Sequence, residues 1–466
     1  MARVSRRRFL QLGGAAAIGI GAAPWLGCAR WRGEAGVERP IELIDHVVVI
    51  YQENWSFDSL FGTFPGANGL ASGLDTVRQV DRDGQLYPTL PPSLDNRRSP
   101  AAPDARIPTG QAVAPFDLGA YVKPSELAGN PLHRYYQHIH QIDGGKLDKF
   151  VAWGNTGGLV MSYYDGTTLP LGRLARDYVL CDNFFQAALG GSFLNHAWLI
   201  CAATPRWPDA PAAMRAQLQG DTLIKDGELS PEGDIVNTAY TINAPHPASI
   251  PRERLAPSLT LPTIGDRLSE RGVSWRWYSG GWDAALAGRA HPNFQFHHQP
   301  FAYFANYADG TAAKAEHLRD EEEIWRDIAT GALPAVTFVK PNGPLNEHPG
   351  YADLLSGQQH VERLIGALMA SPAWRRTAII VTYDEYGGRW DHVPPPIVDP
   401  WGPGTRVPAV IASPYARRRT VDHTVYDTTS ILKFIETRWK LAPLSTRDAA
   451  ANDLTAAFDF TQTPSA

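Results

Sequence analysis

Four short apolar runs, separated by stretches with helical spacing, are the feature that most restricts the fold of this chain. They are "IELIDHVVVIY" at 41–51, "AVTFV" at 335–339, "AIIV" at 378–381 and "AVIAS" at 409–413. Runs of this length predict strands buried on both faces. Apolar residues at 354–368, and at 431–439 after a capping residue, Asp427, fall on single helix faces. We therefore predict an α/β fold with a mostly parallel central sheet and helices on both faces.

Two long stretches, 66–128 and 203–262, interrupt this alternation. Both are rich in proline and glycine and show little periodicity, and the whole chain has 38 prolines and 42 glycines in 466 residues. We interpret them as ordered, loop-rich insertions over the edge of the sheet, with flexible linkers as the alternative. The expected organisation is a single domain over 41–445 with these two insertions, followed by a C-terminal tail at 446–466.

The first 28 residues have the pattern of an export leader. "SRRRFL" at 5–10 matches the twin-arginine motif, and the Ala/Gly-rich run after it is too short and too rich in glycine for a membrane span. "WLGC", ending at Cys28, resembles a lipoprotein cleavage box with Trp25 in place of leucine. We expect export through the twin-arginine translocase to the periplasm, the medium or the cell envelope. Anchoring of the protein to the membrane through a lipidated Cys28 is left open.

The charge of the chain restricts its partners. The formal net charge is −5, and loss of the leader would remove four arginines and no acidic residue. An acidic chain without Lys/Arg-rich, aromatic-interleaved segments excludes nucleic acid as an expected partner. An anion-binding site would have to be locally positive, most simply through a metal ion. Cys181 and Cys201 could pair in an exported protein or could be two small buried residues.

Polar side chains follow several of the predicted strands and turns. They are Glu53-Asn54 after the first strand, Ser192 and Asn195 after a Gly-Gly pair, His297-His298, Glu347-His348, and Asp384-Glu385 after the third strand. In parallel sheets ligands bind at the carboxyl ends of strands. Carboxylate and amide oxygens suit a hard divalent cation, which lowers the pKa of a nearby hydroxyl. Each motif alone is equally typical of a turn, a cap or a surface loop, but the set favours a catalytic site.

The order of these blocks and their residue sequences resemble those of a known protein family. The blocks include "HVVVIYQENWSFDSLFGTFPG", "HRYYQHIHQIDGGKLDKFV", "LPLGRLARDYVLCDNFFQAALGGSFLNHAW", "SWRWYSGGW", "VTYDEYGGRWDHVPPP" and "GPGTRVPAVIASPYAR". They are similar to the bacterial phosphoesterases that include phosphocholine-type phospholipases C and respiratory-burst-inhibiting acid phosphatases. That family belongs to the alkaline phosphatase superfamily. The resemblance extends from about residue 44 to about residue 440 and implies a metal-dependent phosphoric ester hydrolase.

The resemblance also implies roles for individual residues. One divalent metal ion, of unknown identity, would be bound by Glu53, Asn54, Ser192, Asp384 and Glu385. Ser192 would be the nucleophile that forms a phosphoseryl intermediate. The histidines expected around the phosphoryl group are His133, His298 and His348. His297, which is the alternative to His298, and Asn195 are expected to contact the substrate.

The chain departs from the family pattern near the expected site. Trp55 replaces an arginine, Phe193-Leu194 replace a polar residue and a proline, and His196 replaces an arginine. We expect these changes to alter the pocket wall and therefore the substrate. Apolar residues beside Ser192 favour a lipid-like ester, so phospholipase C activity is the first expectation. Acid phosphatase or phosphodiesterase activity on small esters, and a non-catalytic periplasmic binding protein, are the alternatives.

Overall fold

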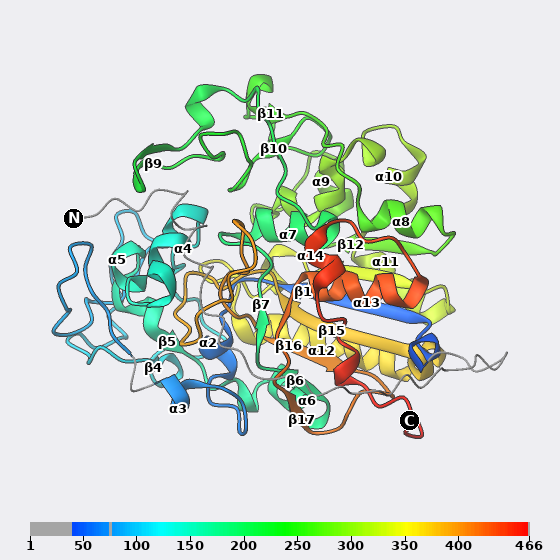
Figure 1. The fold of residues 1–466 in the computed structure, drawn as a ribbon, viewed down its shortest axis with the longest axis horizontal. Coiled ribbons are helices and arrows are strands. Elements are labelled where there is room, and N and C mark those ends of the chain that lie inside the picture. The colour runs from blue at the N-terminus through cyan, green and yellow to red at the C-terminus, as the bar shows by residue number, and fades with distance from the viewer. Residues whose placement is uncertain (1–39, 74–76, 465–466) are drawn as a thin grey trace, which may run out of the picture. The chain divides into compact units, whose positions relative to one another are not determined.

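Eight strands form the central sheet of the computed structural model, which describes residues 40–73 and 77–464 (Figure 1). The order across the sheet is β13-β12-β14-β1-β15-β16-β6-β17. The strands are β1 His46–Gln52, β6 Val179–Cys181, β12 Trp275–Ser279, β13 Leu318–Asp320, β14 Val336–Lys340, β15 Thr377–Tyr383, β16 Ala409–Ala412 and β17 Thr420–Asp422. Only β16 runs antiparallel to its two neighbours, so the predicted, mostly parallel sheet is confirmed. The leader, including Cys28, lies outside the described residues.

Helices cover both faces of the sheet, as predicted (Figure 1). On one side lie α7 Ser192–Cys201, α8 Ile264–Glu270 and α13 Thr429–Trp439; on the other lie α6 Pro170–Asp177 and α12 Leu354–Ala370. Helix α12 buries the apolar stripe that predicted it, including Val361 and Leu364. Helix α13 begins two residues after Asp427, whose carboxylate accepts a hydrogen bond from the backbone N–H of Thr429 at 2.6 Å. Asp427, the capping residue expected from the sequence, therefore satisfies a backbone N–H group at the start of the helix.

Short strands of the two irregular stretches pair with one another or, in one case, with a strand outside 66–128. These are β2 Leu94–Asp95 with β3 Ala102–Pro103, β4 Phe116–Asp117 with β5 Ser162–Tyr163, β8 Gln217–Gln219 with β9 Thr222–Lys225, and β10 Tyr240–Thr241 with β11 Leu255–Ala256. Leu118 from the first stretch and Leu229 from the second are fully buried in the main core. The described residues of both stretches therefore pack against the rest of the fold.

The remaining elements are short. They are α2 Phe57–Phe61, α3 Leu70–Gly73, α4 Tyr135–Ile142, α5 Phe150–Trp153, β7 Phe184–Phe185, α9 Trp282–Leu286, α10 Ala312–His317, α11 Glu322–Thr330, β18 Tyr426–Asp427 and α14 Thr446–Ala450. Helix α14 opens the segment that was expected to be a C-terminal tail. Phe458 of this segment stacks on Phe434 of α13 with ring centroids 5.3 Å apart, and Leu454 is fully buried. Residues 446–464 are thus packed on the body of the protein.

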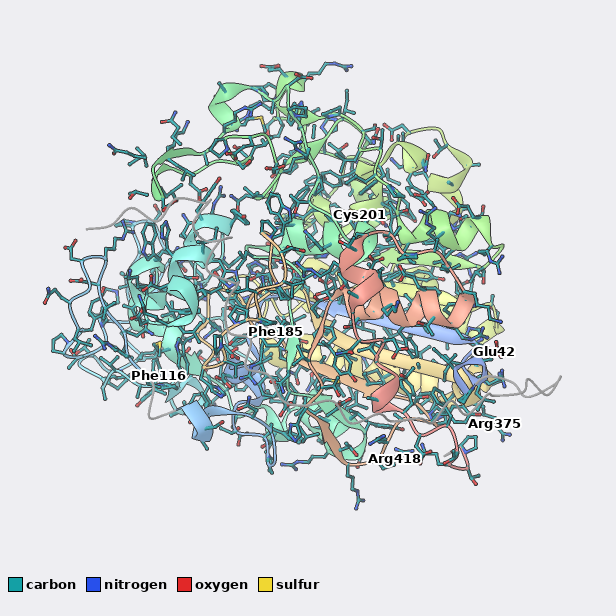
Figure 2. All side chains as sticks on the ribbon, in the orientation of Figure 1. Glu42, Phe116, Phe185, Cys201, Arg375 and Arg418 are labelled. Carbon is teal, nitrogen blue, oxygen red and sulfur yellow. The ribbon has the colours of Figure 1, made fainter. Side chains whose placement is uncertain are left out.

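Cys181 on β6 and Cys201 on α7 are both buried free thiols (Figure 2 labels Cys201). Two interpretations were left open, and the structure confirms the second: the cysteines are two small buried residues and do not form a disulfide. Among the described residues, no helix combines the length and the apolar character needed to cross a membrane.

Glu436 on α13 gives a pH-dependent prediction for stability. Burial and the neighbouring Asp448 raise the pKa of this carboxyl from 4.5 to about 9. Between these values the folded protein keeps a proton that the unfolded chain loses, so the free energy of unfolding falls as pH rises. The slope is at most about 1.4 kcal/mol per pH unit. We expect Glu436→Gln to flatten this dependence and to be more stable than the wild type at about pH 8.

Urea unfolding of both proteins at about pH 5, 6.5 and 8 measures the effect. Glu316→Gln, at an exposed glutamate on α10, is the matched control and should keep the wild-type slope. Equal slopes for the wild type and Glu436→Gln would show that Glu436 is ionised in the folded protein.

Candidate active site

Three neighbouring parallel strands bring the central charged groups together. β14, β1 and β15 lie side by side, so their carboxyl ends meet at one edge of the sheet. These ends carry Lys340, Glu53 and Asp384, all of which are buried. Lys340 Nζ lies 2.7 Å from Glu53 Oε1 and 4.0 Å from Asp384 Oδ2. The carboxylates that follow the apolar strands therefore face one another and a buried ammonium group.

The backbone turns sharply after β15, which allows Asp384 and Glu385 to serve the same site. Adjacent side chains on a continuing strand would point to opposite faces. Gly387 and Gly388 have φ of 64° and 68°, and a Cβ on Gly387 would lie 2.1 Å from the carbonyl oxygen of Asn54. The backbone N–H of Gly387 donates to Glu385 Oε2 at 2.7 Å, and that of Asn54 donates to Asp384 Oδ1 at 3.2 Å. Glycine is therefore required at this reversal, as its position in the sequence suggested.

Ser192 is the first residue of α7, at the entrance to the same cluster. Its Oγ donates to Asn54 Oδ1 at 3.4 Å. The helix N-terminus contributes partial positive charge at this point, which favours a bound anion. A Cβ on Gly191 would lie 2.7 Å from the carbonyl oxygen of His133, so the chain approaches that histidine closely.

Asn195 lies behind this loop and not on the cavity wall. Its side chain accepts a hydrogen bond from the backbone N–H of Ala188 at 2.9 Å and donates to the carbonyls of Ala188 and Gly191 at 3.1 and 3.2 Å. The residue is fully buried. The structure therefore gives Asn195 a place different from the expected substrate contact: it holds the loop that presents Ser192.

His133 and His348 are held in the same way and lie against each other, with ring centroids 5.6 Å apart. Their Nδ1 atoms lie 2.7 and 2.6 Å from the carbonyl oxygens of Pro131 and Pro349, so each Nδ1 carries the proton and each Nε2 faces inward. His133 Nε2 lies 3.6 Å from Glu385 Oε1. Burial lowers the pKa of His133 to about 4 and also lowers the pKa of His348, so both rings are neutral near pH 7.

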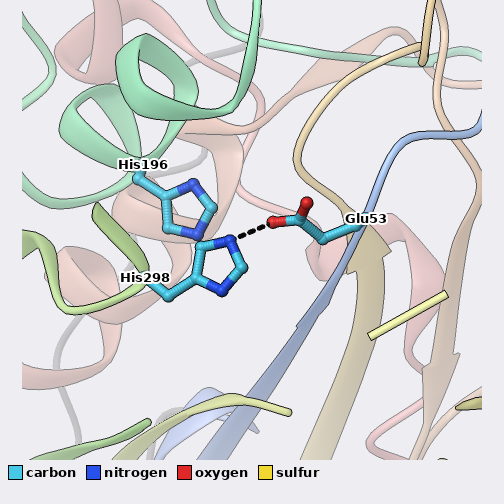
Figure 3. A group of neighbouring side chains, drawn as sticks. All are labelled: Glu53, His196 and His298. Atoms are coloured by element: carbon cyan, nitrogen blue, oxygen red, sulfur yellow. Dashed lines mark ion pairs between the residues drawn. The ribbon is translucent and has the colours of Figure 1, made fainter. Parts of the chain in front are cut away.

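His298 and His196 form a third side of the site with Glu53 (Figure 3). His298 Nε2 lies 2.5 Å from Glu53 Oε1, and its ring is stacked on that of His196 with centroids 5.3 Å apart. His196 Nδ1 lies 2.8 Å from the carbonyl oxygen of Ser192. His298 thus points to the glutamate, whereas His297 lines the adjoining cavity.

Sequence reasoning did not assign Lys340 and His196 to the site. Lys340 ends an apolar strand, and a lysine at the carboxyl end of a fully buried strand was the one pattern that could have indicated it. His196 lies one helical turn after Ser192, and its proximity to Asp384, at 3.7 Å, depends on the packing of α7 against the sheet. Glu347, which the sequence placed among the candidate ligands, accepts hydrogen bonds from Gln52 and Tyr383 at 2.6 and 2.5 Å.

The buried carboxyl groups differ in their protonation. Burial opposes ionisation of Glu53, but His298 and Lys340 outweigh it and hold its pKa well below the usual range. Burial and the charge of Glu53 raise the pKa of Asp384 to about 8. Burial and Asp384 likewise raise the pKa of Glu385. Without a further cation, the protein therefore favours one ionised and two protonated carboxyl groups.

The oxygen atoms at the centre fit a divalent cation. In the described part of the chain, Asp384 Oδ2 and Glu385 Oε1 are buried and have no hydrogen-bond partner. Buried acceptors of this kind are uncommon in folded proteins. Together with Asn54 Oδ1 and Ser192 Oγ they form the hard oxygen set that such ions prefer. Glu53, His196 and His298 also bring one ligand atom each to within 4.8 Å of one another, so nitrogen ligands are available beside this set.

A second acidic group, Asp58, Asp391 and His392, has metal-like spacing but is already neutralised. The buried guanidinium of Arg406 donates to Asp391 at 2.9 Å and to Asp58 at 3.0 Å. His392 Nδ1 lies 2.6 Å from Asp58 Oδ2. This network is a structural ion cluster.

A cavity of about 380 Å³ opens onto the candidate site. Glu53, His133, Ser192, His297 and His348 line its catalytic end. Its other lining residues are Asn96, Asn130, Pro131, Leu132, Arg134, Asn155, Gly191, Phe193, Asn237, Thr238, Gln295 and Tyr351.

The departures from the family pattern change this wall less than expected. Phe193 lines the cavity, but Leu194, Trp55 and His196 do not. Leu194 is fully buried in a hydrophobic cluster with Trp198. The apolar pair beside Ser192 therefore contributes one side chain, not two, to the wall.

The chain is similar to several known proteins. The model of the family described as "Phosphoesterase family" matches residues 44–442. Phospholipase C A of Mycobacterium tuberculosis is 27% identical over 90% of this chain and 78% of that protein. A non-hemolytic phospholipase C of Pseudomonas aeruginosa is 24% identical over 90% of this chain and 57% of that protein. A Vibrio parahaemolyticus structure titled as an alkaline phosphatase superfamily protein aligns with 72% of this chain and 73% of that chain at TM-score 0.36 and 10% identity.

The family match and the phospholipase C relatives show that the protein is a hydrolase that acts on phosphoric ester bonds. The match covers most of the chain. The protein belongs to the phosphoesterase family.

Proposed function

We propose that this protein is a metal-dependent phospholipase C-type enzyme that uses Ser192 as its nucleophile. The observation that carries the proposal is the contact of Ser192 Oγ with Asn54, beside oxygens of Asp384 and Glu385 that are buried and accept no hydrogen bond. Hydrolysis of smaller phosphate esters by the same groups is the second candidate, because the cavity holds only one large apolar side chain beside Ser192, Phe193.

The proposed reaction has two halves. In the first, Ser192 Oγ attacks phosphorus, the bond to the leaving alcohol breaks, and the phosphoryl group becomes attached to Ser192. In the second, water attacks the phosphoserine and returns the serine hydroxyl. A divalent cation held by Glu53, Asn54, Asp384 and Glu385 would supply Lewis-acid stabilisation of a phosphoryl oxygen and would lower the pKa of the Ser192 hydroxyl.

The histidines supply the proton transfers. His133 and His348 are neutral and present Nε2 to the cavity, so each can accept a proton from Ser192 or from water. A bound phosphate ester places negative charge beside these rings and raises their pKa. The protonated ring can then donate to the oxygen of the departing alcohol. Burial lowers the pKa of His298 to about 4, so near pH 7 this ring acts on Glu53 as a neutral hydrogen-bonding partner. The ammonium group of Lys340 then helps to keep Glu53 ionised and available for a cation.

Hydrolysis of p-nitrophenylphosphorylcholine and p-nitrophenyl phosphate by the purified protein, with and without added divalent metal, tests this function. Release of p-nitrophenol from the diester supports the phospholipase C-type reaction. Release from the monoester alone supports a phosphatase. If neither ester is hydrolysed with any of several divalent ions, the proposed function is wrong.

We also propose that the protein is exported in folded form through the twin-arginine translocase. The support is the "SRRRFL" motif at 5–10, and lipid anchoring through Cys28 remains part of this proposal. Replacing Arg6 and Arg7 by lysine is expected to leave full-length precursor in the cytoplasm. Immunoblotting of cell fractions measures this. Unchanged appearance of shortened protein outside the cytoplasm would show that another pathway suffices.

A further inference from the structure

The wall of the cavity beyond the catalytic groups is made mainly of uncharged polar side chains. Its members are Asn96, Asn130, Asn155, Asn237, Thr238 and Gln295. Two of them build the wall itself. Asn96 accepts from the backbone N–H of Asn130 at 2.8 Å and donates to its carbonyl at 2.7 Å. Asn237 accepts from the N–H of Tyr135 at 3.1 Å and donates to the carbonyl of Gly227 at 2.7 Å.

The other polar side chains have hydrogen-bonding capacity to spare. Within the described residues, the side chains of Gln295 and Thr238 have no hydrogen-bond partner, and Asn130 Oδ1 is a buried acceptor without one. Asn155 uses Oδ1 to accept from the N–H of Leu132 at 2.9 Å, which leaves its amide group available. Carboxamides and hydroxyls can both donate and accept, which matches the needs of alcohol groups.

The charged side chains of the wall are already paired with other groups of the protein. Apart from histidines, Arg134 and Glu53 are the only ionisable side chains with a formal charge among the lining residues. Arg134 donates to Asp226 Oδ2 at 2.5 Å and to the carbonyl of Gly227 at 3.0 Å. Glu53 is held by His298 and Lys340 at 2.5 and 2.7 Å. No lining carboxylate is therefore left to face a cationic headgroup.

The two aromatic side chains of the wall each make a ring contact with a neighbouring residue. Tyr351 is stacked on His348, with ring centroids 4.3 Å apart and planes 18° apart. Phe193 packs edge-on against Tyr303 with centroids 5.3 Å apart. A quaternary ammonium group makes no hydrogen bonds and is normally bound by open aromatic faces. It would instead leave the free carboxamides of this wall buried without partners, which costs affinity.

We infer that the phosphate in the natural substrate carries a neutral polyhydroxylated alcohol, such as glycerol, inositol or a sugar, and not choline. The inference rests on the proposed function and narrows its substrate. A phospholipid headgroup and a soluble phosphate ester could both present this chemistry to the wall. In either case the hydroxyl groups bind Asn130, Asn155, Thr238 and Gln295 while the phosphate lies over Ser192.

The test compares matched substrates that differ only in this group. The lipid pair is phosphatidylinositol and phosphatidylcholine in the same detergent micelles. The soluble pairs are glycerophosphoinositol with glycerophosphocholine, and glycerol phosphate with phosphocholine. We expect kcat/KM to favour the polyol ester by about tenfold or more, the discrimination typical of hydrogen bonds to substrate hydroxyls. The pair with the highest kcat/KM identifies the lipid or the soluble source.

Variants of two lining residues test whether the cavity wall causes the preference for polyol esters over choline esters. Gln295→Leu, at a half-buried residue, should lower the polyol-to-choline ratio of kcat/KM by about fivefold or more. Thr238→Val, at an exposed residue, is the second variant if Gln295→Leu unfolds. Gln85→Leu, an exposed glutamine outside the cavity, is the matched control and should keep the wild-type ratio.

The outcomes separate this inference from the function on which it rests. Equal or better hydrolysis of the choline esters overturns the inference and leaves the phosphoric ester hydrolase intact. An unchanged ratio in both folded variants overturns the assignment of the wall. Absence of hydrolysis for every substrate, including both p-nitrophenyl esters, would overturn the proposed function and the inference with it.

Discussion

Ser192→Ala is expected to reduce kcat by more than about a hundredfold while the protein stays folded. The reason is that Ser192 supplies the only hydroxyl within hydrogen-bonding distance of Asn54 Oδ1 among the described residues, and no phosphoserine can form without it. Loss of a nucleophile usually costs several orders of magnitude in kcat. The hydroxyl makes one long hydrogen bond, at 3.4 Å, so its removal should change stability by less than about 1 kcal/mol.

Turnover of p-nitrophenylphosphorylcholine measures the activity, and circular dichroism with thermal unfolding checks the fold. Ser279→Ala is the matched control because Ser279 ends β12 at the same edge of the sheet, is buried and does not line the cavity. It should retain wild-type kcat. A Ser192→Ala protein that keeps more than about a hundredth of wild-type kcat would exclude the covalent role.

Removal of divalent metal is expected to lower both activity and melting temperature. In the metal-free protein, burial and Glu53 raise the pKa of Asp384 to about 8, so near pH 7 this carboxyl is mostly protonated. Metal binding requires the ionised form and should therefore release protons, so the affinity for metal should rise with pH up to about 8. A metal at about 100 times its dissociation constant stabilises the folded state by about 2.7 kcal/mol.

Asp384→Asn separates this effect from general stability. Asparagine resembles the protonated carboxyl, so the variant should be about as stable as the metal-free wild type but should gain little from added metal. Differential scanning fluorimetry with chelator, followed by restored metal, measures the change, and calorimetry in two buffers measures the released protons. If verified metal removal leaves melting temperature and activity unchanged, Asp384 and Glu385 are structural groups.

Local patterns in the sequence predicted four of the eight central strands, β1, β14, β15 and β16, and missed β6, β12, β13 and β17. The run at 47–51 is β1, and the apolar stripe at 354–368 is α12, because burial on both faces or on one face leaves a readable periodicity. The exception is β16, a predicted strand that runs antiparallel to β15. Its direction depends on the long connection through 384–408, and periodicity carries no information about strand direction.

The site was predictable to the extent that it depends on strand ends. Glu53 and Asp384 follow apolar runs that were predicted to be strands of one mostly parallel sheet, so their place at its carboxyl edge follows from the geometry of such sheets. That the two strands are direct neighbours is known only from the structure. The sequence alone determined the α/β class, the carboxylates at the strand ends and the glycines that turn the chain behind them.

Only the tertiary structure decided which side chains face the cavity. Asn195 and Leu194 follow Ser192 on the same short helix, yet the packing of α7 turns one toward the preceding loop and the other into the core. Lys340 joins Glu53 because β14 pairs with β1, although 288 positions separate the two strands' ends at Gln52 and Lys340. Such contacts depend on the rotation of each helix and the pairing of distant strands. Long-range packing sets both, and no local pattern in the sequence records them.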